Sequence, residues 1–371
     1  MAHFTLYEDK LRQNLELIAD VASAADVRII LALKAFAYWP AFPVFADYLT
    51  GATASSLNEA LLIKNRFGKP PHVYAPVYRP HEFEEIAGIA GHLTFNSLTE
   101  LERYRDRWEA AGLSVGLRVN PEYSPVETEL YNPADKYGRL GETLPNLPSK
   151  PPKGLRGLHV HTLCESTAAD TATLIDRVKA QFGHYLEQVE WLNLGGGHLM
   201  TKAGYDTAAL IKTLRNLRAR YPRLEVILEP GSAHLWQTGD LTSTVLDVVE
   251  NYGRRTLMLD VSFTCHMPDT LEMPYRPDIR GASKTEDAAF PYAYRLGGMS
   301  CLAGDYLAEY YFARPVRPGD TLVFEDMSHY TTVKTTMFNG VPHPDIRMVD
   351  AHGETVTERV FTYADYERRM G

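Results

Sequence analysis

Three chemically capable side chains and a run of glycines each stand where an apolar stretch of the sequence ends. Lys34 ends the first stretch, Arg28-Ile-Ile-Leu-Ala-Leu-Lys34. A lysine at the mouth of a buried strand is partly desolvated, which disfavours its ammonium form and frees an amine nucleophile. Such an amine favours imine formation with an aldehyde. The alternative is a lysine whose stem packs on the strand while its ammonium group reaches water.

The other groups are His159-Val-His161, Gly195-Gly-Gly197 and Glu229-Pro-Gly231. Successive glycines let backbone N–H groups approach a phosphate closely. Glu229 can pair with a pyridine nitrogen, and His161 can stack on the ring. Together with Lys34 they predict a site for pyridoxal 5'-phosphate (PLP), whose ring withdraws electrons from a substrate carbanion. Each group also has a simpler interpretation by itself. The glycines fit a tight turn, Glu229 fits an ordinary salt bridge, and His161 fits a buried core histidine.

A metal site is the competing interpretation of the two histidines. Alternation along a strand puts His159 and His161 on the same face. No third ligand stands at an obvious spacing in the sequence, so we predict no metal.

Strands and helices alternate over the first 230 residues, which indicates βαβ units and a parallel sheet. Capping-box patterns at Ser56 and Ser97 open two of the helices. Eight strands predict a closed (β/α)8 barrel, and an open doubly wound sheet is the alternative. Barrel active sites lie at the C-terminal ends of the strands, so the four groups should face one mouth. The candidate strands are 28–34, 51–55, 72–76, 92–96, 114–120, 155–161, 190–197 and 225–231.

The pattern changes after about residue 240. Segments rich in Val, Thr and Leu, joined by turns with Gly and Pro, predict an antiparallel β domain, either a β-sandwich or a β-barrel. They are Leu241–Val249, Thr256–Val261, Thr321–Glu325 and Thr355–Thr362. We therefore predict a barrel over residues 11–240 and a β domain from residues 1–10 and 241–371. A Pro-rich segment, 131–153, is a long loop between the fifth and sixth strands.

Composition excludes several classes of protein. The net charge of −9 argues against nucleic-acid binding, which favours basic surfaces. Three cysteines, Cys164, Cys265 and Cys301, do not make a disulfide framework. No apolar run reaches the length of a membrane span, and no secretory leader stands at the N-terminus. We expect a cytoplasmic protein that does not associate with membranes.

The motifs in their order and spacing resemble the fold-type III PLP decarboxylases, a family that includes ornithine, arginine and diaminopimelate decarboxylases. The resemblance runs nearly end to end, and it implies a barrel plus a β domain. Further segments are similar to carboxynorspermidine/carboxyspermidine decarboxylases, which implies formation of norspermidine or spermidine from a cationic polyamine-like substrate. Those segments are His161-Thr-Leu-Cys-Glu165, Ser262-Phe-Thr-Cys-His-Met-Pro-Asp269 and Gly297-Gly-Met-Ser-Cys-Leu-Ala-Gly-Asp305.

The resemblance also implies residue roles. Lys34 holds PLP covalently, His161 stacks on its ring, Glu229 binds the ring nitrogen and Arg118 lies beside it. The phosphate is surrounded by Gly195, Gly196, Gly197, Gly231 and Tyr330. Asp269 faces a substrate amine, and Cys301 is the proton donor. Cys301 and Asp305 reach in from the other subunit of a homodimer with shared active sites. From charge alone, Glu165 and Glu272 are further candidates for the distal amines.

The sequence departs from the family pattern at three positions. Ser232 follows Glu229-Pro-Gly231 where related enzymes often have arginine, Cys164 replaces a phosphate-binding serine, and Leu302 replaces an acid after the site cysteine. Alternatives are an amino-acid decarboxylase acting on diaminopimelate, ornithine or arginine, a racemase, and a non-catalytic binding protein of polyamine metabolism. The sequence does not separate carboxynorspermidine from carboxyspermidine, because one methylene is worth only about 1–3 kcal/mol.

Overall fold

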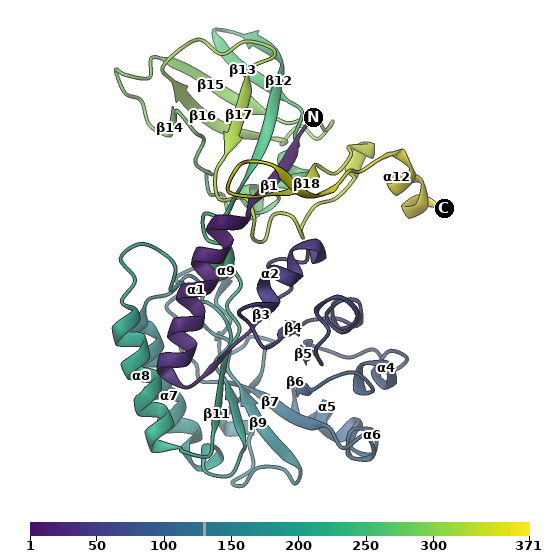
Figure 1. Ribbon diagram of the computed structural model, residues 1–371, viewed down its shortest axis with the longest axis vertical. Helices are drawn as coiled ribbons and strands as arrows, with labels where there is room; N and C mark the ends of the chain where they lie inside the picture. Colours follow the sequence, from purple (N-terminus) through teal and green to yellow (C-terminus); the bar gives the residue numbers. More distant parts are fainter. Residues whose placement is uncertain (129–130) are drawn as a thin grey trace. The chain divides into compact units, whose positions relative to one another are not determined.

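The structure is a computed structural model that describes residues 1–128 and 131–371. The chain divides into two compact units. The barrel unit is Gln13–His234, and the β unit combines Met1–Arg12 with Leu235–Gly371. Figure 1 shows the helices packed around the strands of the barrel unit and the longer strands of the β unit. The division falls within helix α1 (Glu8–Ala25) and before Leu235, the last residue of α9 (Ser232–Leu235).

The strands of the barrel unit pair in a closed ring. Their order is β2-β11-β10-β9-β7-β6-β5-β4-β3, and β2 and β3 are consecutive pieces of one segment, so the pairing returns to its start. All these neighbours are parallel. The predicted (β/α)8 barrel is thereby confirmed. The strands are β2 (Arg28–Ile29), β3 (Leu31–Ala32), β4 (Ala52–Ala54), β5 (His72–Tyr74), β6 (His92–Phe95), β7 (Ser114–Asn120), β9 (Leu155–His159), β10 (Trp191–Asn193) and β11 (Glu225–Leu228).

The first barrel strand is shorter than its apolar run. Ile30 N–H donates to Leu228 O on one side, and Leu31 N–H donates to Gly51 O on the other. The segment thus exchanges hydrogen bonds with β11 first and β4 afterwards. The prediction of one strand over Arg28–Lys34 is wrong at its end, because Lys34 lies in the turn that follows β3.

Local sequence sets the helix ends. Ser56 Oγ accepts Glu59 N–H and Ser97 Oγ accepts Glu100 N–H, so both serines cap helices as predicted. The predicted helix after Ser97 is divided at Tyr104. The other helices of this unit are α2 (Phe42–Ala46), α3 (Leu57–Leu62), α4 (Phe83–Ala87), α5 (Leu98–Arg103), α6 (Arg105–Ala110), α7 (Ala168–Leu186), α8 (Thr207–Arg220) and α9 (Ser232–Leu235). The short strand β8 (Glu142–Thr143) of the Pro-rich loop pairs with β7.

The β unit is one nine-stranded sheet, ordered β14-β16-β15-β13-β12-β1-β18-β19, with β17 beside β12. Pairing is mostly antiparallel, but β1:β18 and β13:β15 are parallel. This corrects the prediction of an antiparallel domain: neither pair is joined by a hairpin, so no turn imposes the antiparallel direction. The elements are β1 (His3–Tyr7), β12 (Gly239–Asn251), β13 (Arg254–Leu259), β14 (Ala282–Ser283), β15 (Tyr292–Gly297), β16 (Tyr306–Phe312), β17 (Thr321–Phe324), β18 (Asp345–Val349), β19 (Thr355–Arg359), α10 (Phe263–His266), α11 (Asp269–Glu272) and α12 (Tyr363–Met370).

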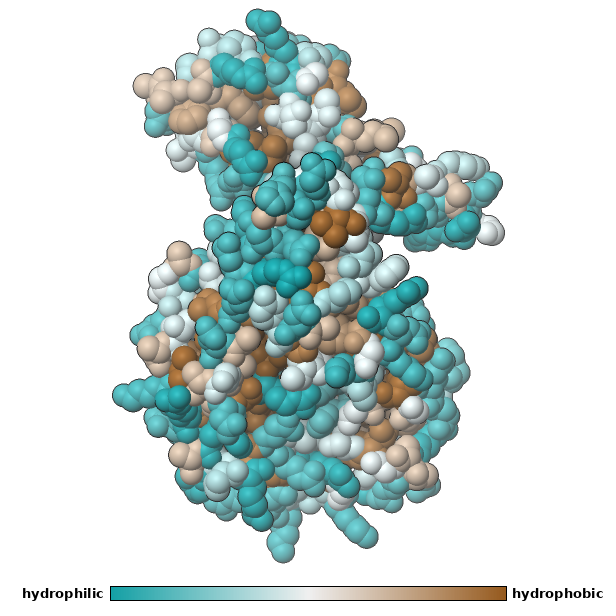
Figure 2. Space-filling model, viewed as in Figure 1, coloured by the Kyte–Doolittle hydropathy of each residue, from teal (hydrophilic) through white to brown (hydrophobic). Residues whose placement is uncertain are grey.

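Each unit has apolar residues at its centre. In the barrel unit, Leu15 and Ile18 on one face of α1 are fully buried, at helical spacing. In the β unit, Leu241, Leu257 and Phe324 belong to one buried cluster. On the face shown in Figure 2, hydrophilic side chains cover most of both units, with apolar residues between them. No helix in residues 1–128 and 131–371 combines the length and apolar character needed to cross a bilayer.

Candidate functional site

Lys34 follows β3 at the C-terminal mouth of the barrel. The four residues before it, Ile30–Leu33, are completely buried and hold the turn in place. The Lys34 side chain presents surface at the mouth, yet the protein around it removes enough water to lower its pKa. Its Nζ lies 3.4 Å from His161 Nε2. A lowered pKa favours the neutral amine, which is the nucleophilic form predicted for Lys34.

Glu229 follows β11 directly and is 4% exposed. Its Oε2 accepts a hydrogen bond of 2.9 Å from Asn193 Nδ2. Its Oε1 lies 3.5 Å from His161 Nδ1 and 3.6 Å from His159 Nε2. Burial and these neighbours fix the carboxylate in place at the mouth, on the strand next to the one that leads into Lys34.

His159 ends β9 and His161 follows it, and their surroundings favour the neutral form of both rings. Burial lowers the pKa of His159 to about 3 and the pKa of His161 well below its usual range, and the nearby Lys34 and Arg118 add to the effect on His161. Their rings are nearly parallel, with centroids 6.0 Å apart. A neutral imidazole suits stacking on an aromatic cofactor. The structure also brings Glu229 to these histidines, with all three ligand atoms within 4.8 Å. Glu229 is therefore a possible third metal ligand, which the spacing of residues in the sequence did not reveal.

The glycine triplet fits tightly against the neighbouring strand ends. Gly195 and Gly197 have positive φ, and a Cβ on Gly195 would lie 2.7 Å from His161. Gly197 O accepts from Ser166 N–H, which joins the turn to the loop after His161. Glycine is required here by backbone conformation and close packing. Gly231, two residues beyond Glu229, is buried directly before α9.

Arg118, on β7, is a buried cation whose partners are neutral. It is 4% exposed, and it donates to Tyr74 Oη at 2.7 Å and to His161 O at 2.8 Å. No carboxylate forms a salt bridge with it in the described residues. A buried charge without an opposite charge is costly. An anionic cofactor at the mouth would supply that charge, and PLP, with its phosphate, fits the donors present.

Two residues important to this arrangement escaped the sequence interpretation. Asn193 ends β10, and its amide holds both Glu229 and, through Oδ1, the N–H of Gly195 at 2.8 Å. Its place two residues before the glycine triplet was the available signal. Glu59 lies in α3, the helix after β4, and burial raises its pKa while the hydrogen bond from Ser55 and the Lys34 charge oppose this rise. The Glu59 carboxylate accepts the Ser55 N–H. In the sequence, Glu59 fits a helix-capping pattern, and this pattern gave no reason to assign it to the site.

The loop after His161 carries Cys164 and Glu165. Burial raises the pKa of the Cys164 thiol, which lies within electrostatic range of Lys34. Glu165 is exposed, and its φ of 45° is in the left-handed region, which is strained for a glutamate. Both residues belong to the barrel unit that holds Lys34.

The remaining predicted residues lie in the β unit. Asp269, at the start of α11, forms an ion pair with Lys334, and Glu272 at the end of this helix is exposed. Tyr330 is half-buried with a φ of 56°, and Cys301 is exposed. The buried Asp305 carboxylate accepts backbone N–H groups within its own unit. Asp305 therefore holds backbone in this chain, and its predicted contact with substrate stays a prediction.

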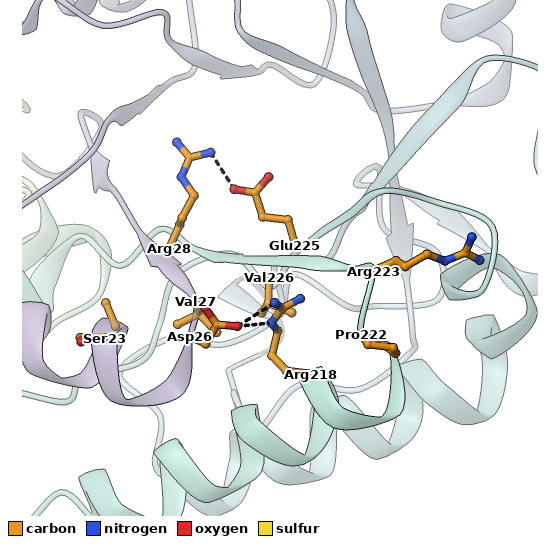
Figure 3. Close-up of a pocket in the computed structure, with 10 residues that line it drawn as sticks. Ser23, Asp26, Val27, Arg28, Arg218, Pro222, Arg223, Glu225 and Val226 are labelled. Carbon is orange, nitrogen blue, oxygen red and sulfur yellow. Dashed lines mark hydrogen bonds and ion pairs between the residues drawn. The ribbon is translucent and has the colours of Figure 1, made fainter.

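A cavity of about 520 Å³ lies away from this mouth. Figure 3 shows it between Arg28, Glu225 and Arg218, with Arg28 paired to Glu225 at 2.8 Å and Arg218 paired to Asp26. Arg28 and Glu225 begin β2 and β11, so this cavity opens at the N-terminal ends of the strands. Its ion pairs serve stability at the end of the barrel opposite Lys34.

A family model and curated relatives of this chain all point to decarboxylases. Residues 17–328 match the family described as "Pyridoxal-dependent decarboxylase, C-terminal sheet domain". The chain is 50% identical over 370 residues to carboxyaminopropylagmatine decarboxylase of Synechocystis sp., covering 99% of this chain and 95% of the relative. It is 39% identical over 375 residues to carboxynorspermidine/carboxyspermidine decarboxylase of Campylobacter jejuni, covering 99% and 97%. The predicted resemblance to that group is confirmed.

Solved structures agree with this result. Carboxynorspermidine decarboxylase from Campylobacter jejuni, complexed with norspermidine, has a TM-score of 0.92 at 37% identity, covering 100% of this chain and 99% of the other. Diaminopimelate decarboxylase from Helicobacter pylori, complexed with L-lysine, has a TM-score of 0.81 at 17% identity, covering 100% and 96%. The second likeness supports the fold alone.

Proposed function

We propose that this chain, which belongs to the family of pyridoxal-dependent decarboxylases, removes the α-carboxylate of a carboxylated polyamine. One observation supports the chemistry most: Lys34, His161 and Glu229 meet at one barrel mouth. The names of the relatives support the substrate class, namely carboxynorspermidine, carboxyspermidine or carboxyaminopropylagmatine. The net charge of −9 is compatible with such cations.

The residues of the chain divide the chemistry among them. Bound PLP supplies an electron sink for the pair left behind by carbon dioxide. Lys34 would supply the amine that holds the cofactor. Glu229, held by Asn193, offers a fixed carboxylate to the ring nitrogen, and Arg118 offers a positive charge to an anionic group. The thiol of Cys301 gives its proton to the carbon that has lost the carboxylate and then regains one from water.

The far end of the substrate distinguishes the candidates. An agmatine-derived substrate ends in guanidinium, which prefers bidentate carboxylates, whereas spermidine-type substrates end in ammonium. We propose Asp269, Glu272 and Glu165 as the acids that receive this end. The relative with 50% identity favours carboxyaminopropylagmatine, and the relatives of 39% and 32% identity favour carboxynorspermidine and carboxyspermidine.

The test is a parallel measurement of kcat/KM on the three carboxylated polyamines and on diaminopimelate, ornithine and arginine. We expect a carboxylated polyamine to exceed every amino acid by at least about a hundredfold, since a site that pairs charged groups rejects substrates lacking them. Preference for one of the amino acids would refute the substrate class but not the cofactor. Racemisation without release of carbon dioxide would refute decarboxylation.

We also propose a cytoplasmic homodimer in which Cys301 serves the partner's Lys34. In a two-fold pair, mixing Lys34→Ala with Cys301→Ala gives about half heterodimers, each with one intact site. Activity should therefore recover to roughly a quarter of wild type. If subunits exchange and no activity returns, the shared site is refuted.

A further inference from the structure

Three segments of the β unit, distant in sequence, are hydrogen-bonded to one another. They are residues 262–266, 298–305 and 336–342, named here the Asp305 cluster. Met299 N–H, in the second, donates to Val261 O beside the first at 3.0 Å. Thr336 N–H, in the third, donates to Cys265 O at 2.8 Å. Cys301 lies in the second segment, so its position depends on how the cluster is held together.

The Asp305 carboxylate joins two of these segments. It is 4% exposed. Oδ1 accepts N–H groups from Phe263 at 2.7 Å and Thr264 at 3.1 Å, and Oδ2 accepts the N–H of Ser300 at 3.0 Å. Hydrogen bonds to a carboxylate are about twice as strong as neutral ones, and they offset the cost of burying the charge. Asp305 therefore fixes the backbone directly before Cys301.

Asn339 fixes Cys301 itself from the third segment. Its Oδ1 accepts the Cys301 N–H at 2.8 Å. Asn339 has φ 57° and ψ 15°, in the left-handed region, and Gly340 after it also has positive φ. Asparagine tolerates this conformation better than most residues. Left-handed residues other than glycine concentrate at functional sites, because the surrounding structure must hold them there.

We propose that Asp305 and Asn339 are positioning residues that set the location of the Cys301 thiol. Asp305 holds the turn before the cysteine, and Asn339 holds the cysteine's own backbone. The consequence for turnover rests on the proposed role of Cys301 as proton donor. The effect on the location of the thiol does not rest on that role. The positioning hypothesis and the proton-donor hypothesis can therefore be tested separately.

The principal variant is Asn339→Gly, which keeps the left-handed backbone and removes only the side-chain acceptor. Asn339→Asp restores an acceptor oxygen. Asn132→Ala is the matched control, because Asn132 Oδ1 likewise accepts a backbone N–H, from Ala134 at 2.9 Å, in the barrel unit. Asp305→Asn perturbs the cluster independently, since its amide group faces backbone donors.

The first measurement is the rate of iodoacetamide alkylation of Cys301, followed by peptide mass spectrometry with Cys164 as the internal reference. We expect the ratio of the two rates to change roughly fivefold in Asn339→Gly, the population shift expected for one hydrogen bond. Asp305→Asn should change it in the same direction, while Asn339→Asp and Asn132→Ala should stay near wild type. An unchanged ratio in Asn339→Gly refutes the positioning role.

The second measurement separates KM from kcat in the holoenzyme. Asn339→Gly should lower kcat about tenfold with KM and PLP absorbance unchanged, because misplacement of a reacting group mainly slows the chemical step. If Cys301→Ala loses activity but Asn339→Gly keeps full kcat, positioning is refuted. If Cys301→Ala keeps full activity, the donor role is refuted, and the alkylation ratio alone then decides whether Asn339 positions the thiol.

Discussion

Replacing Glu229 with glutamine removes one charge from the site and little else. The carboxylate has one hydrogen-bond donor, Asn193 Nδ2, and two neutral histidine nitrogens within 3.6 Å. The amide oxygen of Glu229→Gln can accept from Asn193, and its NH2 can donate to a histidine. We therefore expect folding stability to fall by less than about 1 kcal/mol, because the hydrogen bonds are replaced.

Activity should respond much more strongly. An opposite charge beside an ionisable group moves its pKa by roughly 1–3 units. At 1.36 kcal/mol per unit this is about 1.4–4 kcal/mol, or roughly ten- to a thousandfold in rate. A neutral amide cannot hold the protonated ring nitrogen in this way. Glu229→Gln should bind PLP, by its visible absorbance, and should lose kcat within that range.

The same strand supplies the control. Glu225 is the first residue of β11, whereas Glu229 directly follows the last. Glu225 forms an ion pair with Arg28 at 2.8 Å. Glu225→Gln should leave kcat unchanged and cost at most about 1 kcal/mol of stability, the usual value of an exposed pair. Near-normal turnover of PLP-loaded Glu229→Gln would show that Glu229 is not the ring partner. An equal loss of kcat in Glu225→Gln would point to a general effect of charge.

Further predictions concern the amine, the substrate's far end and acid stability. Lys34→Ala should lose turnover and the borohydride-fixed PLP signal; carbon dioxide release by this variant would contradict the assignment. Lys334→Met removes the ion-pair partner of Asp269, so KM for a polyamine substrate should fall roughly two- to fivefold, as expected for an exposed ion pair. An unchanged KM would argue against Asp269 as the acceptor of the substrate amine. Burial lowers the pKa of His234 to about 4. The unfolded chain, with a histidine pKa near 6.5, therefore takes up the proton first, and stability is lost as the pH falls from about 6.5 towards 4. Urea unfolding at pH 7.5 and 5 should show this loss shrinking by about 2 kcal/mol in His234→Phe; an unshifted pH slope would contradict it.

The sequence by itself determined the order of elements and the groups at the mouth of the barrel. Eight short apolar segments that alternate with helices favour a closed barrel, and the alternative that the sequence leaves is an open doubly wound sheet. Parallel strands place their C-terminal ends together, so Lys34, His161 and Glu229 had to converge once the barrel was recognised. The spacing of apolar residues and the residue types in turns and helix caps are local properties, so the sequence shows them directly.

Tertiary structure decided which polar groups hold one another. The position of Asn193 before the glycine triplet is a local signal, but its bond to Glu229 depends on the alignment of β10 with β11. The Asp305 carboxylate accepts three N–H groups from segments up to 42 residues away, a role that the sequence did not indicate. The parallel pairs in the β unit were hidden for the same reason. Hydrogen bonds between distant segments depend on register and packing, which no local pattern encodes.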